Sequence, residues 1–448
     1  MKGFTISQAA AACGGSMNIP EFEDRELGQI VIDSRKVAPG DLFAAYRGEK
    51  VDGHDYIGAA LDKGAACCLA ELVPEGETRP VILVPDVQKA LEQIAAAYRA
   101  TLSLPVVGIT GSVGKTSAKE MIAAVLASRY KILKTEGNLN NQIGVPMTVS
   151  RIEPEHEAAV VEMGISGFGE MTALARIARP TLAVFTVIGH AHLEFLNDLD
   201  GVFRAKTEML AFLPEDGTVI VNGDDPYLRA LRCPQRKICV GFGEDNDLRA
   251  EDIRLEGEAG MACTVVCGAR RFPVRIPAFG RHLIYAALEG AAVGMVLGLT
   301  DEEIAEGLTR FQAVGHRSAV IDTGRLTLID DCYNANPDSV RSGLDSLSEL
   351  PGRHVAILGD MLEMGENGPA LHRDIGRYCR EKGVDLLLAS GPLARYYIEG
   401  AGDVGRLFAS REALIEALPQ LLRQGDAVLV KASLGMGFLA VAEAVRQL

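Results

Sequence analysis

The sequence Gly108-Ile109-Thr110-Gly111-Ser112-Val113-Gly114-Lys115-Thr116 connects an apolar run to a helical pattern. Glycines let the backbone turn tightly, so that successive N–H groups converge on phosphate oxygens. Lys115 adds a positive charge there, and the Thr116 hydroxyl can reach a magnesium ion. The general pattern GxxxxGK[ST] would place a glycine at position 109, whereas here the leading glycine is Gly108. We therefore predict a nucleotide triphosphate site, the alternative being a glycine-rich strand-to-helix turn with an unrelated lysine.

Apolar runs and helical patterns alternate on both sides of this loop. From Val106 onward the runs are VVGIT, AAVVEMG, LAVFTVIG and GTVIVNGDD, and each ends in glycine or a polar residue. Such nearly continuous runs predict a parallel sheet that is covered by helices on both faces. In this architecture ligands bind at the carboxyl ends of the strands. The residues that directly follow each run are therefore the candidates for function.

The length of the chain, 448 residues, allows several domains at roughly 100–200 residues each. After residue 313 the alternation resumes with LTLIDD, HVAILGD, DLLLAS and AVLVKAS. We expect helices over Val87–Leu102, Arg281–Leu299 and Asp301–Phe311. The predicted fold class is α/β with three domains: an N-terminal domain (1–103), a central phosphate-loop domain with a parallel sheet and flanking helices (104–312), and a C-terminal Rossmann-like domain (313–448).

The composition excludes two classes of function. The chain has 45 basic and 60 acidic side chains and a net charge of −15, whereas sequence-independent binding of nucleic acid needs basic patches. No stretch reaches the roughly 18–20 uninterrupted apolar residues that a membrane helix requires, so we expect no integral membrane segment. The nine cysteines are scattered without CxxC pairs, which favours free thiols in a reducing compartment. We expect a cytoplasmic protein.

Polar residues that follow the next strands are candidate metal ligands. Glu162 ends the run AAVVE, where a carboxylate that faces Thr116 would suit magnesium; the alternative is an acidic residue on a solvated loop. His190 and His192 lack a third nitrogen or sulfur ligand at a spacing usual for zinc. One histidine near magnesium and phosphates is the better interpretation, with His190 as a bystander. Lys206, taken by itself, fits an ordinary surface lysine.

Taken together, the segments TGSVGKTS, VEMGIS, GHAHLE and VFRAKTEML resemble the Mur ligase family, the ATP-dependent amino-acid ligases of peptidoglycan precursor synthesis. The resemblance implies that Lys206 is carbamylated, and that Lys115, His192 and Lys206 are catalytic. A carbamate changes the charge of the side chain from +1 to −1 and offers two oxygens to a metal ion. By resemblance, Thr116 and Glu162 hold one Mg²⁺, and His192 and carbamylated Lys206 serve a second.

The resemblance also implies which residues bind the substrates. Those for ATP are Thr110, Gly111, Ser112, Val113, Gly114, Lys115, Thr116, Ser117, Arg317 and Asp331. Those for the UDP-sugar are Ser34, Arg35, Asn140, Asn141 and Ser166. Asn334, Asn336 and Ser339 either lie near the incoming dipeptide or cap the helix that starts after Pro337.

Within the family, YNANP (residues 333–337) resembles the segment of the member that joins D-alanyl-D-alanine to UDP-N-acetylmuramoyl-tripeptide through an acyl phosphate. We expect these small molecules as partners of a monomer. Two departures stand out: Leu283 and Ala286 occupy positions near adenine where asparagine is common, and Leu434 stands where arginine is frequent. The alternatives are a ligase that adds one amino acid to UDP-muramoyl-dipeptide, a folylpolyglutamate synthase-like enzyme, and a phosphate-loop ATPase switch.

Overall fold

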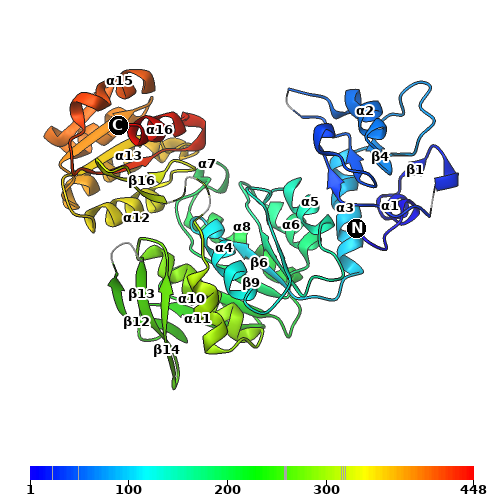
Figure 1. Ribbon diagram of the computed structural model, residues 1–448, viewed down its shortest axis with the longest axis horizontal. Helices are drawn as coiled ribbons and strands as arrows, with labels where there is room; N and C mark the ends of the chain where they lie inside the picture. The colour runs from blue at the N-terminus through cyan, green and yellow to red at the C-terminus, as the bar shows by residue number, and fades with distance from the viewer. Residues whose placement is uncertain (23, 49, 257–259, 314, 316, 318) are drawn as a thin grey trace.

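The computed structural model describes residues 1–22, 24–48, 50–256, 260–313, 315, 317 and 319–448. Within these residues the strands form three separate sheets, in successive parts of the chain. Figure 1 shows the N-terminal and C-terminal units at opposite ends of the central unit. The α/β class with three units is therefore confirmed, whereas the domain limits at 103/104 and 312/313 stay predictions.

The N-terminal sheet has the strand order β1-β5-β4-β3-β2, parallel except for β1, which pairs with β5 in the antiparallel direction. A long helix follows it and ends two residues earlier than predicted, where the Thr101 hydroxyl donates to Tyr98 O (2.7 Å). The elements are α1 (Ile6–Cys13), β1 (Ser16–Met17), β2 (Ile30–Val31), β3 (Leu42–Ala44), α2 (Ile57–Asp62), β4 (Cys67–Ala70), β5 (Val81–Leu83) and α3 (Val87–Ala100).

The central sheet has the strand order β14-β13-β12-β11-β10-β9-β6-β8-β7. Its elements up to the middle of the domain are β6 (Val106–Thr110), α4 (Lys115–Leu126), β7 (Ile132–Lys134), α5 (Gly144–Ser150), β8 (Ala158–Glu162), α6 (Glu170–Ala178), β9 (Leu182–Phe185), α7 (Leu193–Leu196) and α8 (Leu199–Thr207). The others are β10 (Thr218–Asn222), α9 (Pro226–Ala230), β11 (Arg236–Gly241), β12 (Leu248–Leu255), β13 (Met261–Cys267), β14 (Arg270–Ile276), α10 (His282–Val296) and α11 (Asp301–Thr309).

The prediction of a parallel central sheet is right for the strands from β7 to β12 and wrong at one edge. There β12, β13 and β14 form an antiparallel meander. Only two residues connect β13 to β14, and the first of them, Gly268, has a φ of 58°. So short a connection suits antiparallel strands, because parallel strands need a crossover of a dozen residues or more.

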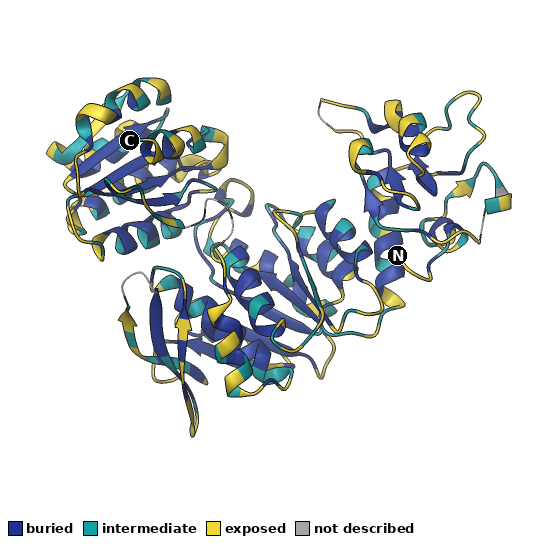
Figure 2. Cartoon of the chain, in the orientation of Figure 1, coloured by how far each residue is buried: buried dark blue, intermediate teal, exposed yellow. Residues whose placement is uncertain are grey.

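Successive residues of the central strands enter two different apolar cores, one on each face of the sheet. On β6, for example, Val106 packs with α5 and α6, whereas Val107 packs with α4 and α10. This period of two is the geometry of a strand that is covered on both faces. Figure 2 shows the consequence, a sheet of buried residues between helices that expose only their outer sides.

The C-terminal sheet has the strand order β15-β16-β20-β17-β18-β19, parallel except for β15. Helices α12, α13 and α14 pack on one face, and α15 and α16 pack on the other. The elements are β15 (Ala319–Asp322), β16 (Thr327–Asp331), α12 (Pro337–Ser348), β17 (His354–Gly359), α13 (Gly368–Glu381), β18 (Leu386–Ser390), α14 (Ala394–Ala401), β19 (Gly405–Phe408), α15 (Arg411–Leu421), β20 (Ala427–Lys431) and α16 (Leu439–Arg446).

Among the described residues, no helix is both long and apolar enough to cross a membrane.

Candidate active site

Two glycines shape the loop between β6 and α4. Gly111 has a φ of 155°, and a Cβ at this position would lie 1.9 Å from Thr186 Oγ1. Gly114 has a φ of 85° and directly precedes α4. The Ser112 N–H donates to Val187 O (2.8 Å), which ties the loop to the segment after β9. The loop therefore presents the start of a 12-residue helix to the cavity, a geometry that attracts anions.

Thr116 and Glu162 come together although 46 residues separate them. Thr116 Oγ1 lies 3.1 and 3.0 Å from the two carboxylate oxygens of Glu162, which ends β8. Glu162 is 1% exposed, and it also accepts a hydrogen bond from Asn140 Nδ2 (2.8 Å). Lys119 Nζ lies 3.6 Å from Glu162 Oε2 and compensates the buried charge. The carboxylate and the hydroxyl thus form a compact set of hard oxygen donors.

Two lysines near these donors have lowered pKa values. Lys115 Nζ donates to Gly111 O (2.7 Å), and burial lowers its pKa, with Arg317 adding to the effect and Glu162 opposing it. Lys206 lies on α8 and is 1% exposed. Burial, and secondarily the charge of Lys115, lowers the pKa of Lys206 well below its ordinary value. The surroundings of Lys206 therefore favour a neutral amine over an ammonium group, and Lys206 is not the surface lysine that its local pattern suggests.

The two histidines meet acidic side chains of the C-terminal domain. His192 has a φ of 54°, and its Nδ1 lies 2.5 Å from Glu363 Oε2. Burial lowers the pKa of His192, and Glu363 opposes this shift. The His190 N–H donates to Asp338 Oδ2 (2.6 Å), and this carboxylate raises the pKa of the His190 ring. Both histidines therefore take part in contacts between the central and C-terminal domains.

The C-terminal domain contributes a second basic group and an aspartate. The guanidinium carbon of Arg317 lies 3.8 Å from the centre of the Tyr333 ring, a cation–π geometry that orients the charge. Asp331 and Lys431 end the neighbouring strands β16 and β20, and Lys431 Nζ lies 2.5 Å from Asp331 Oδ2. These side chains lie at the carboxyl edge of the sheet, as parallel topology predicts.

Asn336 and Ser339 cap α12. Asn336 Oδ1 accepts a hydrogen bond from Ser339 N–H (2.8 Å), and Ser339 Oγ accepts one from Asn336 N–H (3.0 Å). This reciprocal pair is a capping box, so the capping alternative holds for both residues. Asn334 is exposed, and its Oδ1 accepts a hydrogen bond from Ala335 N–H (2.9 Å). All three also face the cavity described next.

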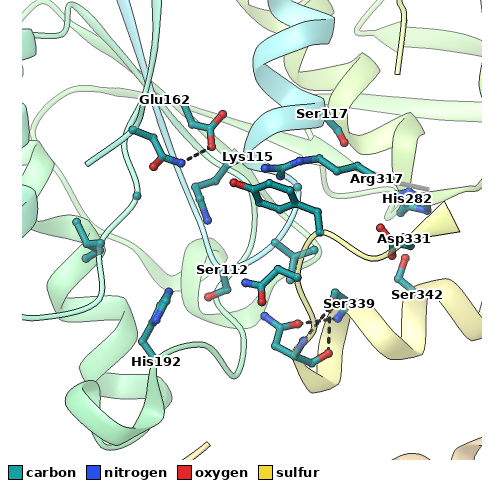
Figure 3. A pocket seen from close by; sticks show the side chains of 18 of the residues that line it. Ser112, Lys115, Ser117, Glu162, His192, His282, Arg317, Asp331, Ser339 and Ser342 are labelled. Atoms are coloured by element: carbon teal, nitrogen blue, oxygen red, sulfur yellow. Dashed lines mark hydrogen bonds between the residues drawn. The ribbon is translucent and has the colours of Figure 1, made fainter. Parts of the chain in front are cut away.

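A cavity of about 300 Å³ lies where the two domains meet. Figure 3 shows Lys115, Glu162 and His192 of the central domain opposite Asp331 and Ser339 of the C-terminal domain. The predicted site residues that line it are Ser112, Val113, Gly114, Lys115, Ser117, Asn140, Asn141, Glu162, Ser166, His192, Arg317, Asp331, Asn334, Asn336 and Ser339. Thr110, Gly111, Thr116 and Lys206 are buried beneath or beside this wall.

The UDP-sugar residues do not form a single group. Ser34 and Arg35 line a separate cavity of about 430 Å³ in the N-terminal domain, whereas Asn140, Asn141 and Ser166 line the cavity between the other two domains. The Arg35 guanidinium makes two hydrogen bonds of 2.9 Å to Asp33, and this pairing lowers the pKa of the Asp33 carboxyl to about 2. The charge of Arg35 is therefore shared with a neighbouring carboxylate.

Models of one protein family match the chain in three consecutive parts. The model described as "Mur ligase family, catalytic domain" matches residues 26–99, "Mur ligase middle domain" matches 109–294, and "Mur ligase, glutamate ligase domain" matches 310–434. A UDP-N-acetylmuramoyl-tripeptide–D-alanyl-D-alanine ligase of Bacillus subtilis (strain 168) is 35% identical, over 96% of either chain.

The chain belongs to the Mur ligase family.

Solved structures of Mur ligases share the whole architecture. MurF from Acinetobacter baumannii matches with a TM-score of 0.90 and 30% sequence identity, over 99% of either chain. MurF ligase from Thermotoga maritima in complex with ADP matches with a TM-score of 0.85 and 28% identity, over 95% of this chain and 98% of that one. The arrangement of three sheets is thus that of known Mur ligases.

Sequence reasoning missed several residues of this Mur ligase's cavity. They are Gly164, Ile165, His282, Tyr333, Ser342 and Lys431. Lys431 ends the apolar run AVLVK, so the rule applied to Glu162 would also have found it. His282 and Ser342 lie on helices, where their local patterns carry no comparable signal. Glu363 was missed as well, because its contact with His192 joins positions 171 residues apart.

Proposed function

We propose that this Mur ligase joins the amino group of D-alanyl-D-alanine to the terminal carboxylate of UDP-N-acetylmuramoyl-tripeptide, while ATP is cleaved to ADP and phosphate. The product is the pentapeptide precursor of peptidoglycan. The observation that carries the proposal is the shared cavity, in which the phosphate loop faces Arg317 and Asp331 of another domain. The named ligation of the Bacillus subtilis relative, which matches nearly the full length, supports the choice of substrates.

ATP binds across the cavity in this proposal. Its phosphates meet the N–H groups of the β6–α4 loop and the Lys115 ammonium group, since both are directed toward anions. Arg317 reaches the same phosphates from the C-terminal domain, and Asp331 accepts hydrogen bonds from the ribose hydroxyls. Closure of the two domains then assembles the site and excludes water.

The first chemical step activates the tripeptide. An oxygen of its terminal carboxylate attacks the γ-phosphorus, a new O–P bond forms, and the bond to the bridging oxygen breaks so that ADP leaves with the electron pair. Catalysis of such a transfer is mainly positioning and charge neutralisation. Lys115 and Arg317 are the side chains of this chain that supply positive charge at the phosphates.

The second step forms the amide. The deprotonated amine of D-alanyl-D-alanine attacks the carbonyl carbon of the acyl phosphate and forms a tetrahedral intermediate. The C–O bond to phosphate then breaks, and phosphate leaves with the electron pair. Asn334, Asn336 and Ser339 lie on the wall of the cavity that belongs to the C-terminal domain, so we assign them to the dipeptide side.

Magnesium fits the donor set that the structure presents. Among the described residues no cluster of three or more His, Cys, Asp or Glu side chains could hold a metal ion alone, so each ion needs further oxygen donors. Thr116 and Glu162 supply two adjacent ones, and phosphate oxygens would complete the shell. His192 and the Lys206 carbamate would hold the second ion. When bound, the ions offset the negative charge of the reacting phosphates and carboxylate.

The surroundings of Lys206 support its carbamylation. A neutral ε-amine can attack carbon dioxide: an N–C bond forms, one proton is released, and the side chain becomes an anion. Because burial, and secondarily the charge of Lys115, disfavours the ammonium form and lowers the pKa of Lys206, it favours the neutral amine that this reaction needs. The anion would also balance the nearby charge of Lys115.

The UDP-sugar spans two domains in this proposal. Ser34 and Arg35 bind the diphosphate in the N-terminal cavity, where Arg35 exchanges part of its pairing with Asp33 for phosphate oxygens. Asn140, Asn141 and Ser166 hold the peptide end beside the phosphate loop. The separation of the two groups suits a long substrate that has its nucleotide at one end and its reacting carboxylate at the other.

An ADP-release assay with product mass analysis tests the proposal. We expect release only when UDP-N-acetylmuramoyl-tripeptide, D-alanyl-D-alanine and ATP are all present, together with a pentapeptide product. The Lys115→Ala variant serves as a negative control. Release of ADP at the full rate in the absence of D-alanyl-D-alanine would indicate a phosphate-loop ATPase. If a single amino acid were ligated to UDP-muramoyl-dipeptide faster than D-alanyl-D-alanine to the tripeptide, the chain would be the ligase that adds one amino acid.

A further inference from the structure

A second cavity, of about 200 Å³, adjoins the site on the side of the central domain. Val113, Gly114, Ser117, His282 and Ser342 line both cavities, so the two are contiguous. The remaining lining residues are Thr186, Val187, Asn222, Tyr285, Ala286, Glu289 and Asp338. The phosphate loop thus separates the main cavity from a pocket in which apolar and aromatic groups predominate over charges.

One face of α10 forms a wall of this second cavity. His282, Tyr285, Ala286 and Glu289 follow one another at spacings of three, one and three, which places them on one side of a helix. Leu283 and Ala286 are the positions at which this chain lacks the asparagines that its resemblance to the family would lead one to expect. The small Ala286 leaves space beside Glu289, which lies almost one turn further along the helix.

Glu289 is a buried carboxyl group with unused hydrogen-bonding capacity. The residue is 1% exposed, and its Oε1 has no hydrogen-bond partner in the part of the chain that the structure describes. An unsatisfied buried polar atom is costly, and its retention calls for an explanation. Burial raises the pKa of Glu289 to about 8, so the group is mostly protonated at neutral pH and has both a donor and an acceptor.

Two further residues give the pocket a fixed shape. The Tyr285 ring packs against the Phe242 ring with the centroids 4.3 Å apart and the ring planes tilted by 40°, and its hydroxyl donates to Asp224 Oδ2 (2.9 Å). The Tyr285 side chain is therefore held in place both by its ring and by its hydroxyl group. Asn222 Oδ1 accepts a hydrogen bond from Asp224 N–H (3.0 Å), which leaves the NH₂ donors of Asn222 for other partners.

We propose that Glu289 recognises the adenine base of ATP in this chain: its carbonyl oxygen accepts a hydrogen bond from the 6-amino group, and its hydroxyl donates to an adjacent ring nitrogen. The inference rests on the proposed function, since it assumes that the triphosphate lies on the adjoining phosphate loop. Tyr285 offers the base an aromatic wall.

The test combines substitutions of Glu289 with changes in the nucleotide. Binding of ATP, of purine riboside triphosphate, which lacks the 6-amino group, and of inorganic tripolyphosphate is measured by calorimetry. The full-length wild type, Glu289→Leu and Glu289→Gln are compared. For Glu289→Leu we expect at least a tenfold rise in the Kd for ATP and less than a twofold change for tripolyphosphate. Purine riboside triphosphate should bind the wild type more weakly than ATP does, whereas Glu289→Leu should bind the two nucleotides equally well.

Two controls separate recognition from folding. Glutamine retains one donor and one acceptor, so Glu289→Gln should bind ATP within about threefold of wild type. Leucine removes the unsatisfied carboxyl group, so Glu289→Leu should unfold at a higher temperature than wild type. The inference would be overturned if Glu289→Leu bound ATP with a Kd within threefold of the wild-type value. It would also be overturned if the substitution weakened the binding of tripolyphosphate as much as that of ATP. Tight ATP binding without amide formation would contradict the proposed function alone; a wild type that binds no ATP would contradict both.

Discussion

Lys206 shows how strongly the meaning of a residue depends on its surroundings. Its local pattern, VFRAKTEML, is that of a helix with an exposed lysine, yet the side chain is buried next to the charge of Lys115. A buried ammonium group beside another positive charge is unfavourable, whereas a neutral amine or a carbamate that binds magnesium is not. The burial of Lys206 is therefore not indicated by its local pattern, and its carbamylation stays a prediction from the resemblance of a longer segment.

We expect Lys206→Ala to reduce ligation by roughly 100-fold, because the second metal ion loses a ligand. In ¹³C-bicarbonate, the wild type should give a carbamate carbon signal in NMR that the variant lacks. Lys237→Ala is a matched control, because Lys237 Nζ donates to carbonyl oxygens away from the site. A wild type without the signal, or a variant of normal activity, would contradict the assignment.

Glu289 also gives a prediction about pH and stability. A glutamate in the unfolded chain ionises near 4.5, whereas burial raises the pKa of Glu289 to about 8 in the folded protein. Between these values the folded state holds a proton that the unfolded state releases, so the free energy of unfolding decreases as pH rises. This contribution reaches about 1.4 kcal/mol per pH unit and is absent in Glu289→Gln.

Urea unfolding at pH 6, 7 and 8 measures this effect. The free energy of unfolding of Glu289→Gln minus that of wild type should increase over this range. A difference that stays constant with pH would show that Glu289 does not titrate there.

Sequence reasoning could place Lys115, Thr116 and Glu162 at one edge of the central sheet, because Glu162 ends an apolar run and the other two lie in the loop and helix that follow one. It could not predict Glu289, since a single acidic residue within GRHLIYAALEGAA would be expected on the surface of its helix.

Among the elements, α12 carries both a structural and a candidate functional role. Its first turn is closed by the capping box of Asn336 and Ser339, and the same turn lines the cavity. We expect Asn336→Ala to lower the free energy of unfolding by about 1 kcal/mol. Asn336→Asp should retain the cap, because its carboxylate accepts the same hydrogen bond and is favourable at a helix N-terminus.

Comparing the two Asn336 variants separates the roles. Stability is measured by denaturant unfolding, and the KM for D-alanyl-D-alanine by the ligation assay. A stable Asn336→Asp variant with a KM raised severalfold would place the side chain at the dipeptide. Unchanged kinetics in both variants would leave Asn336 with the cap alone.

The elements themselves were partly predictable. Helices such as Val87–Ala100 agree with the sequence pattern within two residues, because amphipathic spacing is local information. The sequence did not predict that β12, β13 and β14 pair in the antiparallel direction at one edge of the central sheet. CTVVC indicates a strand, but a strand pattern does not specify which neighbour it pairs with or in which direction.

At the scale of the whole molecule, the two domain junctions differ in chemistry. The N-terminal and central domains share one apolar core, in which α3 packs against α5 and α6. Tyr98 donates to Ile152 O (2.5 Å), and Arg99 Nε donates to Ala178 O (2.9 Å) across this junction. By contrast, the contacts of His190 and His192 with the C-terminal domain are polar. Such a difference between junctions cannot be predicted from domain-level patterns.

We expect scanning calorimetry to resolve two unfolding transitions, because domains that share a core unfold together and a domain with a polar junction unfolds by itself. Hydrogen exchange during the first transition should identify residues of either the C-terminal unit or the other two units, but not both. Three transitions, or a single one, would contradict this division.

The proposed reaction depends on an acyl phosphate, and the transfer of an oxygen atom from the tripeptide to phosphate shows whether this intermediate forms. UDP-N-acetylmuramoyl-tripeptide labelled with ¹⁸O in its terminal carboxylate is ligated to D-alanyl-D-alanine, and the released phosphate is analysed by mass spectrometry. If the carboxylate attacks the γ-phosphorus, one ¹⁸O atom enters each phosphate formed. Phosphate that carries no ¹⁸O while the labelled tripeptide is converted to pentapeptide would rule out an acyl phosphate intermediate.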